Sequence, residues 1–289
     1  MILVEDRSIP TFVVGSKSYT AVAINAAAKA GEWIKSRVGA YKELNMKMSP
    51  SDLVTEVDKG AELMIQKLIK TYFPDHDFLG EEGVSSGSDG ATLTAEDHME
   101  SEYLWIVDPI DGTTNFVHGH PYFCVSIALA VKGEVIVGVI YDPMHDEMFV
   151  AEKGKGAYVH GNPMSVSKEE VLIHSLLAVG FNPEPTVGLP TNMRGINALS
   201  SRTRSLRAMG SAALHLAYVA AGRLTGYYEV GLHSWDVAAG VLLVTESGGR
   251  VTDTQGGPFN LTVSRLVATN GLIHQELLTV IDESQATGM

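Results

Sequence analysis

A short apolar run, Tyr103–Val107, is followed by two carboxylates three residues apart, and this feature constrains the fold most. Its aromatic and β-branched residues predict a buried strand, which Asp108-Pro109 is expected to end. Because Pro109 has a fixed φ and no N–H to donate, the turn can aim Asp108, Asp111 and the Ile110 carbonyl at one point. Hard cations such as Mg²⁺ take oxygen ligands of this kind. The sequence therefore predicts a cation site at the end of a buried strand.

The residues after these carboxylates suit an anion or a water molecule. Gly112 and Thr113 offer backbone N–H groups and a hydroxyl beside the acidic pair. The structural alternative is a turn with a capping aspartate and a satisfied partner. At average composition, the string Asp-Pro-x-Asp-Gly-Thr arises by chance on the order of once in 10⁴ chains of this length. The string therefore favours a functional site over an ordinary turn.

Further acidic and small-residue motifs each have a structural alternative. Glu81, in Gly-Glu-Glu-Gly, is by itself typical of a solvated surface. Asp236, in Trp-Asp-x-Ala-Ala-Gly, is expected to open an apolar helix, where an N-cap alone would explain it. Asp52, Thr55 and Asp58 can be capping residues and nothing more, with Thr55 as the N-cap of the helix expected after it. Gly210-Ser211-Ala212 precedes an alanine-rich helix, which indicates either an anion site or a close-packed helix start.

Strands and helices alternate in blocks along the chain, which predicts a mixed, layered α and β fold. Apolar spacing predicts helices near residues 18–38, 56–73, 211–221, 236–246 and 274–281. Strands are expected near residues 76–79, 103–107, 225–230, 250–253 and 266–269, with a meander over 122–159 and a surface loop over 83–102. The pattern changes past Gly161-Asn162-Pro163, so we expect an N-terminal α+β subdomain, 1–160, and a C-terminal α/β subdomain, 161–289.

Charge and cysteine content exclude several classes of protein. The chain has 21 Lys and Arg against 34 Asp and Glu, a net charge of −13, which makes it a poor binder of nucleic acid or anionic membrane. No apolar run approaches the roughly 18 residues of a membrane span, and the N-terminus is not a signal peptide. Cys124 is the single cysteine, so no internal disulfide forms, which suits a reducing cytoplasm. We therefore expect a cytoplasmic protein.

Other catalytic classes lack their residues. Cys124 has no arginine five positions later and reads as a core residue, and no kinase-type or dinucleotide-binding glycine motif is present. His118, His120 and His233 do not form a zinc motif, and the carboxylates favour magnesium-like ions. For the basic stretch Arg194–Arg207 we favour a solvated surface over a patch that attracts anionic substrate.

Taken together, four motifs resemble the inositol monophosphatase family of the Mg²⁺-dependent, lithium-sensitive sugar-phosphatase superfamily. They occur in the family order at 52–58, 80–82, 108–113 and 235–240, and the resemblance covers roughly residues 20–285. It implies a layered α-β-α-β-α sandwich and a homodimer. It also places most metal ligands in the N-terminal subdomain, and Glu229 and Asp236 in the C-terminal one.

The resemblance also implies roles for individual residues. The metal ligands, for two or three Mg²⁺ ions, would be Glu81, Asp108, the Ile110 carbonyl, Asp111 and Asp236. The attacking water would be oriented or activated by Thr113 with Asp58, near Lys47, and Glu81 would also serve catalysis through a weaker third ion. The substrate would meet Ile110, Asp111, Gly112, Thr113, Gly210, Ser211, Ala212 and Glu229.

These roles imply a phosphomonoesterase that hydrolyses a small polyol phosphate through metal-activated water. The leading substrate is myo-inositol 1-phosphate, because Glu229 stands seven residues before Asp236, where inositol-binding members carry a glutamate. The alternatives are histidinol phosphate, fructose 1,6-bisphosphate or an adenosine 3′,5′-bisphosphate. An alternative of another class is a regulatory protein- or RNA-binding protein with a vestigial site.

Overall fold

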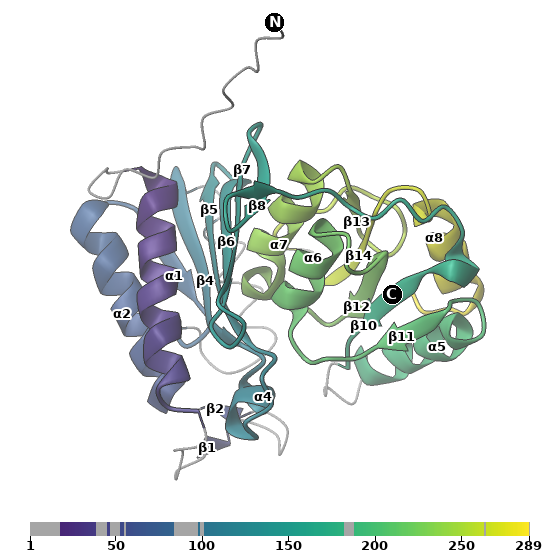
Figure 1. The fold of residues 1–289 in the computed structure, drawn as a ribbon, viewed down its shortest axis with the longest axis horizontal. Coiled ribbons are helices and arrows are strands. Elements are labelled where there is room, and N and C mark those ends of the chain that lie inside the picture. Colours follow the sequence, from purple (N-terminus) through teal and green to yellow (C-terminus); the bar gives the residue numbers. More distant parts are fainter. Residues whose placement is uncertain are drawn as a thin grey trace, which may run out of the picture.

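The protein folds into five layers in the order α-β-α-β-α (Figure 1). The computed structural model describes residues 18–38, 45–46, 53–54, 56–83, 98, 101–181, 188–262 and 264–288. Helices α1 (Tyr19–Lys35) and α2 (Glu56–Tyr72) form one outer layer. Helices α5 (Gly188–Ser200) and α8 (His274–Glu283) form the other. The layered sandwich expected from the sequence is confirmed.

A seven-stranded sheet lies behind α1 and α2. Its strands follow chain order, β3 and β4 run parallel, and every later pair is antiparallel. The strands are β3 (Asp77–Gly80), β4 (Tyr103–Asp111), β5 (Cys124–Val131), β6 (Glu134–Asp142), β7 (Glu147–Glu152), β8 (Gly156–Val159) and β9 (Asn162–Pro163). Lys132 and Gly133 both have positive φ, 50° and 78°, as a tight hairpin turn between β5 and β6 requires. The predicted meander is confirmed.

Strand β4 corrects one sequence prediction. We expected the strand to stop before Asp108-Pro109, but it continues to Asp111. The ladder with β5 shifts register between Asp108, opposite Ser126, and Asp111, opposite Cys124. A residue in such a bulge needs no ladder N–H, so Pro109 is tolerated inside the strand. The bulge carries both carboxylates into the interior of the molecule.

The outer helices α1 and α2 cover the large sheet by their apolar faces. In α1, the Ser18 hydroxyl caps the helix by accepting from the Ala21 N–H at 3.2 Å. The buried residues of α1 include Ala23, Ala26, Ala27, Ala30 and Ile34. In α2, Val57, Ala61, Ile65 and Ile69 form the buried stripe. Both predicted helices are confirmed within a few residues. The expected N-cap Thr55 lies outside the described residues.

A five-stranded sheet forms the second β layer, in the order β11-β10-β12-β14-β13. Its strands are β10 (Leu176–Val179), β11 (Ser205–Arg207), β12 (Gly226–Val230), β13 (Arg250–Thr252) and β14 (Arg265–Thr269). The strands predicted near 225–230, 250–253 and 266–269 are confirmed, as is the helix predicted near 274–281. Strands β10 and β11 and helix α5 were not predicted. Helix α5 carries Pro190 in its first turn and Gly195 inside it, which weakens its helical pattern.

Helices α6 (Ala212–Ala220) and α7 (Ser234–Glu246) form the middle layer between the two sheets (Figure 1). Helix α7 packs against β5 and β6 of the large sheet, and α6 against β12 of the small one. The backbone of α7 approaches β6 so closely that a Cβ on Gly138 would lie 2.6 Å from the Ala239 carbonyl oxygen. No described helix has the length and apolarity needed to cross a bilayer.

Candidate active site

The site begins at Asp108, where the β4 bulge turns its carboxylate inward. The side chain is 3% exposed, and its Oδ1 accepts from the Ile110 N–H at 3.0 Å. Burial is the largest cause that raises the pKa of Asp108 well above its ordinary value, followed by the charges of Glu81, Asp111 and Asp236. These causes show that carboxylates from distant parts of the chain converge on Asp108.

Asp111 connects β4 to the start of α6. Its Oδ2 accepts from the Ser211 hydroxyl at 2.6 Å and from the Ala213 N–H at 2.6 Å, and its Oδ1 accepts from the Ala212 N–H at 3.3 Å. Burial and the charge of Asp236 raise the pKa of Asp111 to about 7, although these hydrogen bonds act to lower it. Asp111 therefore combines two roles, because it joins the acidic group and also binds the N-terminus of a helix.

Asp58 and Thr113 meet beside this acidic pair. Asp58, in the first turn of α2, is 1% exposed. The Thr113 hydroxyl lies 3.1 Å from Asp58 Oδ1 and 3.0 Å from the Ile110 carbonyl oxygen. Thr113 begins the short helix α4 (Thr113–Val117), after Gly112 in the left-handed region at φ 100°. A Cβ on Gly112 would lie about 3.0 Å from the Tyr122 carbonyl oxygen, so glycine is required here.

Glu81 and Asp236 are far apart in the sequence, yet, after the larger effect of burial, the charges of both raise the pKa of Asp108. Glu81 follows β3, and its N–H donates to the Val107 carbonyl at 3.2 Å. Asp236 was expected to open a helix, but α7 begins two residues earlier, with His233 as the N-cap. Asp236 Oδ2 accepts from the His233 N–H at 2.7 Å, so its carboxylate faces the positive end of the helix.

Glu229 lies in β12, on the small-sheet side, and is 9% exposed. The Tyr227 hydroxyl donates a short hydrogen bond to its Oε2. Burial raises the pKa of Glu229 to about 8, against the lowering effect of this bond. A Cβ on Gly180 would lie 1.6 Å from Oε2, so the carboxylate rests directly on the backbone after β10.

The donor set fits a hard divalent cation. Among the described residues, no three carboxylate, imidazole or thiol groups are gathered closely enough to enclose an ion. Burial and neighbouring negative charges nevertheless raise the pKa of both Asp108 and Asp111, so both carboxyl groups ionise less readily than in water. Within the described part of the chain, neither forms an ion pair with lysine or arginine. Oxygen ligands with uncompensated negative charge are what Mg²⁺ takes.

Other predicted residues fall outside this group. Lys47 lies outside the described residues, as do Asp52 and Thr55 of the first motif. Cys124 is buried, as expected of a core residue, but its Sγ lies 3.9 Å from Asp111 Oδ2 and therefore lines the back of the site. His118 and His120 are exposed beyond α4, and the His233 ring stacks on Trp235 at 4.7 Å.

The arginines of the basic stretch form hydrogen bonds and an ion pair at the surface, on the side of the five-stranded sheet. Arg194 donates to the Gln285 carbonyl, and Arg202 pairs with Glu283 at 2.8 Å. Arg207 donates to the Ser205 hydroxyl at 2.7 Å. These contacts agree with the solvated surface favoured from the sequence.

Two side chains at the site were not predicted from the sequence. Tyr227 binds Glu229, as described above. Asn115, in α4, donates from Nδ2 to the Tyr122 carbonyl at 2.7 Å and to the Met209 carbonyl at 2.6 Å. Asn115 follows the acidic motif by only four residues, which is the one signal in the sequence that could have indicated it.

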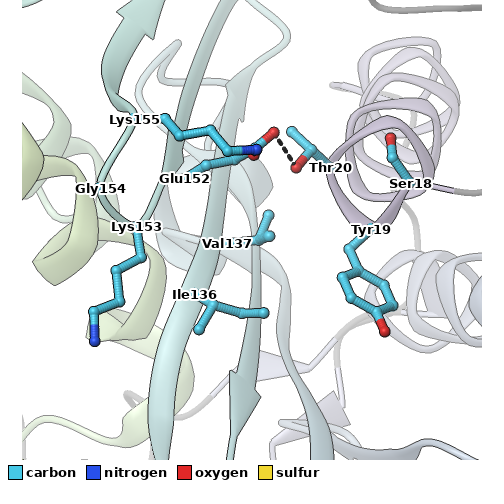
Figure 2. Close-up of a pocket in the computed structure, with 9 residues that line it drawn as sticks. All are labelled: Ser18, Tyr19, Thr20, Ile136, Val137, Glu152, Lys153, Gly154 and Lys155. Atoms are coloured by element: carbon cyan, nitrogen blue, oxygen red, sulfur yellow. Dashed lines mark hydrogen bonds and ion pairs between the residues drawn. The ribbon is translucent and has the colours of Figure 1, made fainter.

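A separate pocket of about 630 Å³ opens between the start of α1 and strands β6 and β7 (Figure 2). Its lining includes Tyr19, Ile136 and Lys155, and the Thr20 hydroxyl donates to Glu152 Oε1 at 2.6 Å across it. None of the residues predicted to bind metal or substrate lines this pocket. The convergent carboxylates, and not this pocket, therefore define the candidate active site.

Comparisons with known proteins find similar proteins over nearly the whole chain. A sequence model of the inositol monophosphatase family matches residues 16–286. Inositol monophosphatase 2 of Solanum lycopersicum is 44% identical over 273 residues, which cover 93% of this chain and all of that one. Nus factor SuhB of Pasteurella multocida is 42% identical, with 90% of this chain and 94% of that one covered. The solved structure of a Thermotoga maritima IMPase has a TM-score of 0.81 at 35% identity, with 91% and 96% covered.

These matches define the class of the protein first: it is a phosphatase enzyme, because family, fold and acidic site coincide over nearly the whole chain. The chain belongs to the inositol monophosphatase family. Members of this family depend on metal ions, in agreement with the buried carboxylates.

Proposed function

We propose that this enzyme is a Mg²⁺-dependent phosphomonoesterase that releases phosphate from a small polyol phosphate, foremost myo-inositol 1-phosphate. The observation that carries the proposal is the group of carboxylates around the buried Asp108, one of which, Asp111, binds the N-terminus of α6. Phosphate monoesters hydrolyse very slowly in water, so the site must supply a large acceleration. A buried acidic group that can bind cations suits that task.

The residues that would hold the metal ions are Glu81, Asp108, the Ile110 carbonyl, Asp111 and Asp236. When bound, Mg²⁺ supplies Lewis-acid activation of water and stabilises charge on the departing alkoxide. Two or three ions are proposed on the resemblance of the four motifs. The mutual repulsion of the buried carboxylates supports the proposal, since cations would relieve it.

Thr113 and Asp58 are proposed to orient the attacking water. The Thr113 hydroxyl can donate to Asp58 Oδ1, which leaves a lone pair of the Thr113 oxygen free to accept from the water. Asp58 thereby fixes the direction of the hydroxyl. Lys47 is proposed to tune this pair electrostatically. Glu81 is proposed to assist through the weaker third ion.

The phosphate is proposed to lie against Ile110–Thr113, where the chain turns at Gly112 into α4. The left-handed backbone of Gly112 leaves no room for a side chain, so the backbone itself can approach the anion. Asp111, Gly210, Ser211, Ala212 and Glu229 are proposed to meet the alcohol portion. Glu229 supports a polyol, because a buried carboxylate accepts hydrogen bonds from hydroxyl groups.

A panel of phosphate monoesters at fixed Mg²⁺ tests the substrate. We expect myo-inositol 1-phosphate to have the highest kcat/KM, above histidinol phosphate, fructose 1,6-bisphosphate and adenosine 3′,5′-bisphosphate. A higher kcat/KM for any of these three would reassign the substrate within the same chemistry. A regulatory role with a vestigial site is not favoured, because every predicted metal position holds an oxygen ligand. A chain with no turnover on any substrate would revive it.

Three further properties are proposed with this function. Lithium at millimolar concentration is expected to inhibit, as the family resemblance implies, and unchanged rates across a lithium titration would contradict this. The enzyme is proposed to be a homodimer, which sedimentation equilibrium would test. It is proposed to act in the cytoplasm, in keeping with the single buried cysteine.

A further inference from the structure

Two side chains of the segment after β4 cross to the start of α6. Asp111 binds Ser211, Ala212 and Ala213, as described above. Asn115 is the second, and it uses both hydrogens of its amide: one for the Tyr122 carbonyl, at 2.7 Å, and one for the Met209 carbonyl, at 2.6 Å. Tyr122 leads into the large sheet, whereas Met209 leads into α6. One amide therefore joins the two sides of the site.

The backbone around the Asn115 amide is closely packed. Gly210 has a φ of 85°, and a Cβ there would lie 3.0 Å from Asn115 Nδ2. A Cβ on Gly112 would lie 3.1 Å from the Gly210 carbonyl oxygen. The Met209 N–H is held as well, since it donates to His215 Nε2 at 3.3 Å. The loop that begins α6 is thus fixed against Gly112 on one side and against α6 on the other.

The Asn115 contacts differ from those of Asp111 in their dependence on charge. The Asp111 carboxylate is one of the groups proposed to bind a cation, so its bonds to α6 compete with the metal. The Asn115 amide is neutral, and both of its acceptors are backbone carbonyls. Neither hydrogen bond therefore involves a group that titrates or that is proposed to bind a cation.

We propose that Asn115 is a positioning residue, which sets the separation between the phosphate-binding turn at Gly112–Thr113 and the alcohol-binding start of α6 at Gly210–Ala212. This inference rests on the proposed function. The two binding segments contact opposite ends of one small substrate, so the distance between them must match the length of that substrate. A displacement of about 1 Å can reduce the rate about 10²-fold.

The test compares Asn115→Asp and Asn115→Ala with the matched surface change Asn197→Asp on α5. Asp keeps the volume of Asn but turns both donors into acceptors that face two carbonyls, whereas Ala only removes the donors. Asn197 is exposed on the outer helix α5, which carries none of the proposed site residues. We expect kcat on myo-inositol 1-phosphate to fall about 100-fold in Asn115→Asp and about 10-fold in Asn115→Ala, with Asn197→Asp unchanged.

Inhibition constants separate positioning from a general loss of structure. Inorganic phosphate needs only the turn at Gly112–Thr113, so its inhibition constant should stay within about twofold of the original value. Binding of myo-inositol together with phosphate needs both the turn at Gly112–Thr113 and the start of α6. It should weaken at least about tenfold, because the distance between these two segments is no longer fixed. An equal rise of both constants would overturn the proposal, because Asn115 would then support the phosphate turn itself.

Hydrogen–deuterium exchange in the metal-free full chain provides a readout that does not need activity. We expect faster exchange in peptides covering 208–216 for both Asn115 variants, and no change for Asn197→Asp. Unchanged exchange together with unchanged kcat would overturn the proposal. If the unmodified enzyme hydrolyses no polyol phosphate, the proposed function fails, while exchange still decides whether Asn115 joins the two sides. Should Asn115→Asp not fold, Asn115→Ala carries the same measurements.

Discussion

The two sides of the site differ in how their polar groups are satisfied. On the large-sheet side, Asp108 is buried among carboxylates, with Glu81 and Asp111 raising its pKa. On the small-sheet side, two polar groups at the site have partners within the protein. Glu229 accepts from the Tyr227 hydroxyl, and the N–H groups at the start of α6 donate to Asp111. Asp111 is the group that belongs to both sides.

This difference assigns a different kind of partner to each side. Buried like charges without a counter-charge are costly, and a fold retains them where a bound cation removes the cost. Buried groups that already have hydrogen-bond partners can instead recognise a neutral alcohol by exchanging one partner for another. The difference therefore supports the proposal that the large-sheet side binds ions and phosphate and the small-sheet side binds the polyol.

Removal of metal should have the largest effect, because it acts on the large-sheet side as a whole. Exhaustive treatment with EDTA is expected to reduce turnover of myo-inositol 1-phosphate to the detection limit, and added Mg²⁺ is expected to restore it. Mg²⁺ at about 100 times its dissociation constant should also stabilise the fold by about 2.7 kcal/mol. Robust turnover after chelation would break the comparison, since the carboxylates would then have another purpose.

Asp111→Asn tests the residue shared by the two sides. Asn keeps the volume and one oxygen but removes the charge, so kcat should fall at least about 10²-fold, on the order of 3 kcal/mol. Melting of the metal-free protein should stay near the original value, because lost attraction to α6 is offset by relief from Asp236. The control is Asp282→Asn on the exposed face of α8. A variant that retains more than about a tenth of kcat, a loss under about 1.4 kcal/mol, contradicts the metal assignment.

Glu229→Gln sharpens the comparison on the small-sheet side. The amide fills the same space beside Gly180 but places an NH₂ donor where a carboxyl oxygen accepts hydrogen bonds, so KM for myo-inositol 1-phosphate should rise about tenfold, or about 1.4 kcal/mol. Mg²⁺ dependence should stay intact, since Glu229 is not among the proposed ligands. Steady-state kinetics over a Mg²⁺ titration measure both. A large loss of metal affinity with unchanged KM would show that Glu229 serves metal binding and not substrate binding.

The stability of the metal-free protein should fall as the pH rises from 6.5 to 8. The native pKa values of Asp111, about 7, and Glu229, about 8, exceed their ordinary values, so the native state binds more protons than the unfolded state in this window. His215 and His274 have lowered pKa values, about 3 and 4, and act in the opposite sense only below about pH 6.5.

Urea unfolding at several pH values, with and without Mg²⁺, measures this effect. Saturating Mg²⁺ should remove or reverse the fall, because binding requires the ionised carboxylates and releases protons. A metal-free protein whose stability rises steadily from pH 6.5 to 8 would show that the pKa values of the buried carboxyl groups are not raised in the native state.

Much of the fold could be predicted because its elements are long and periodic. Helix α2 was found from apolar residues at helical spacing, and β5 and β6 from two apolar runs around Lys132-Gly133. The four-residue strand β10 and the helix α5 were missed, since their local patterns are weak and tertiary packing decides them. The division at about residue 160 stays a prediction. Strand β4 was cut short because a proline in a bulge resembles a proline that ends a strand.

The candidate site could be predicted where side chains with characteristic chemistry follow one another. Asp108, Asp111 and Thr113 form one short string, and the structure brings Asp58 to them from α2. The role of Asn115 could not be predicted, because its partners are backbone carbonyls at positions 122 and 209. Backbone atoms are the same for every residue type, so such contacts leave no pattern in the sequence. The roles proposed for the metal and substrate residues stay predictions.

The close approach of α7 to Gly138 has a consequence for synthesis of the chain. The large sheet is complete when residue 163 has been made, but the helix that covers its inner face begins only at Ser234. Until then, apolar residues of β5 and β6 lack their cover, which makes the growing chain prone to aggregation. A chain truncated between residue 163 and Ser234 would leave one face of the large sheet uncovered. The N-terminal half therefore needs the C-terminal half for its stability as well as for the substrate site.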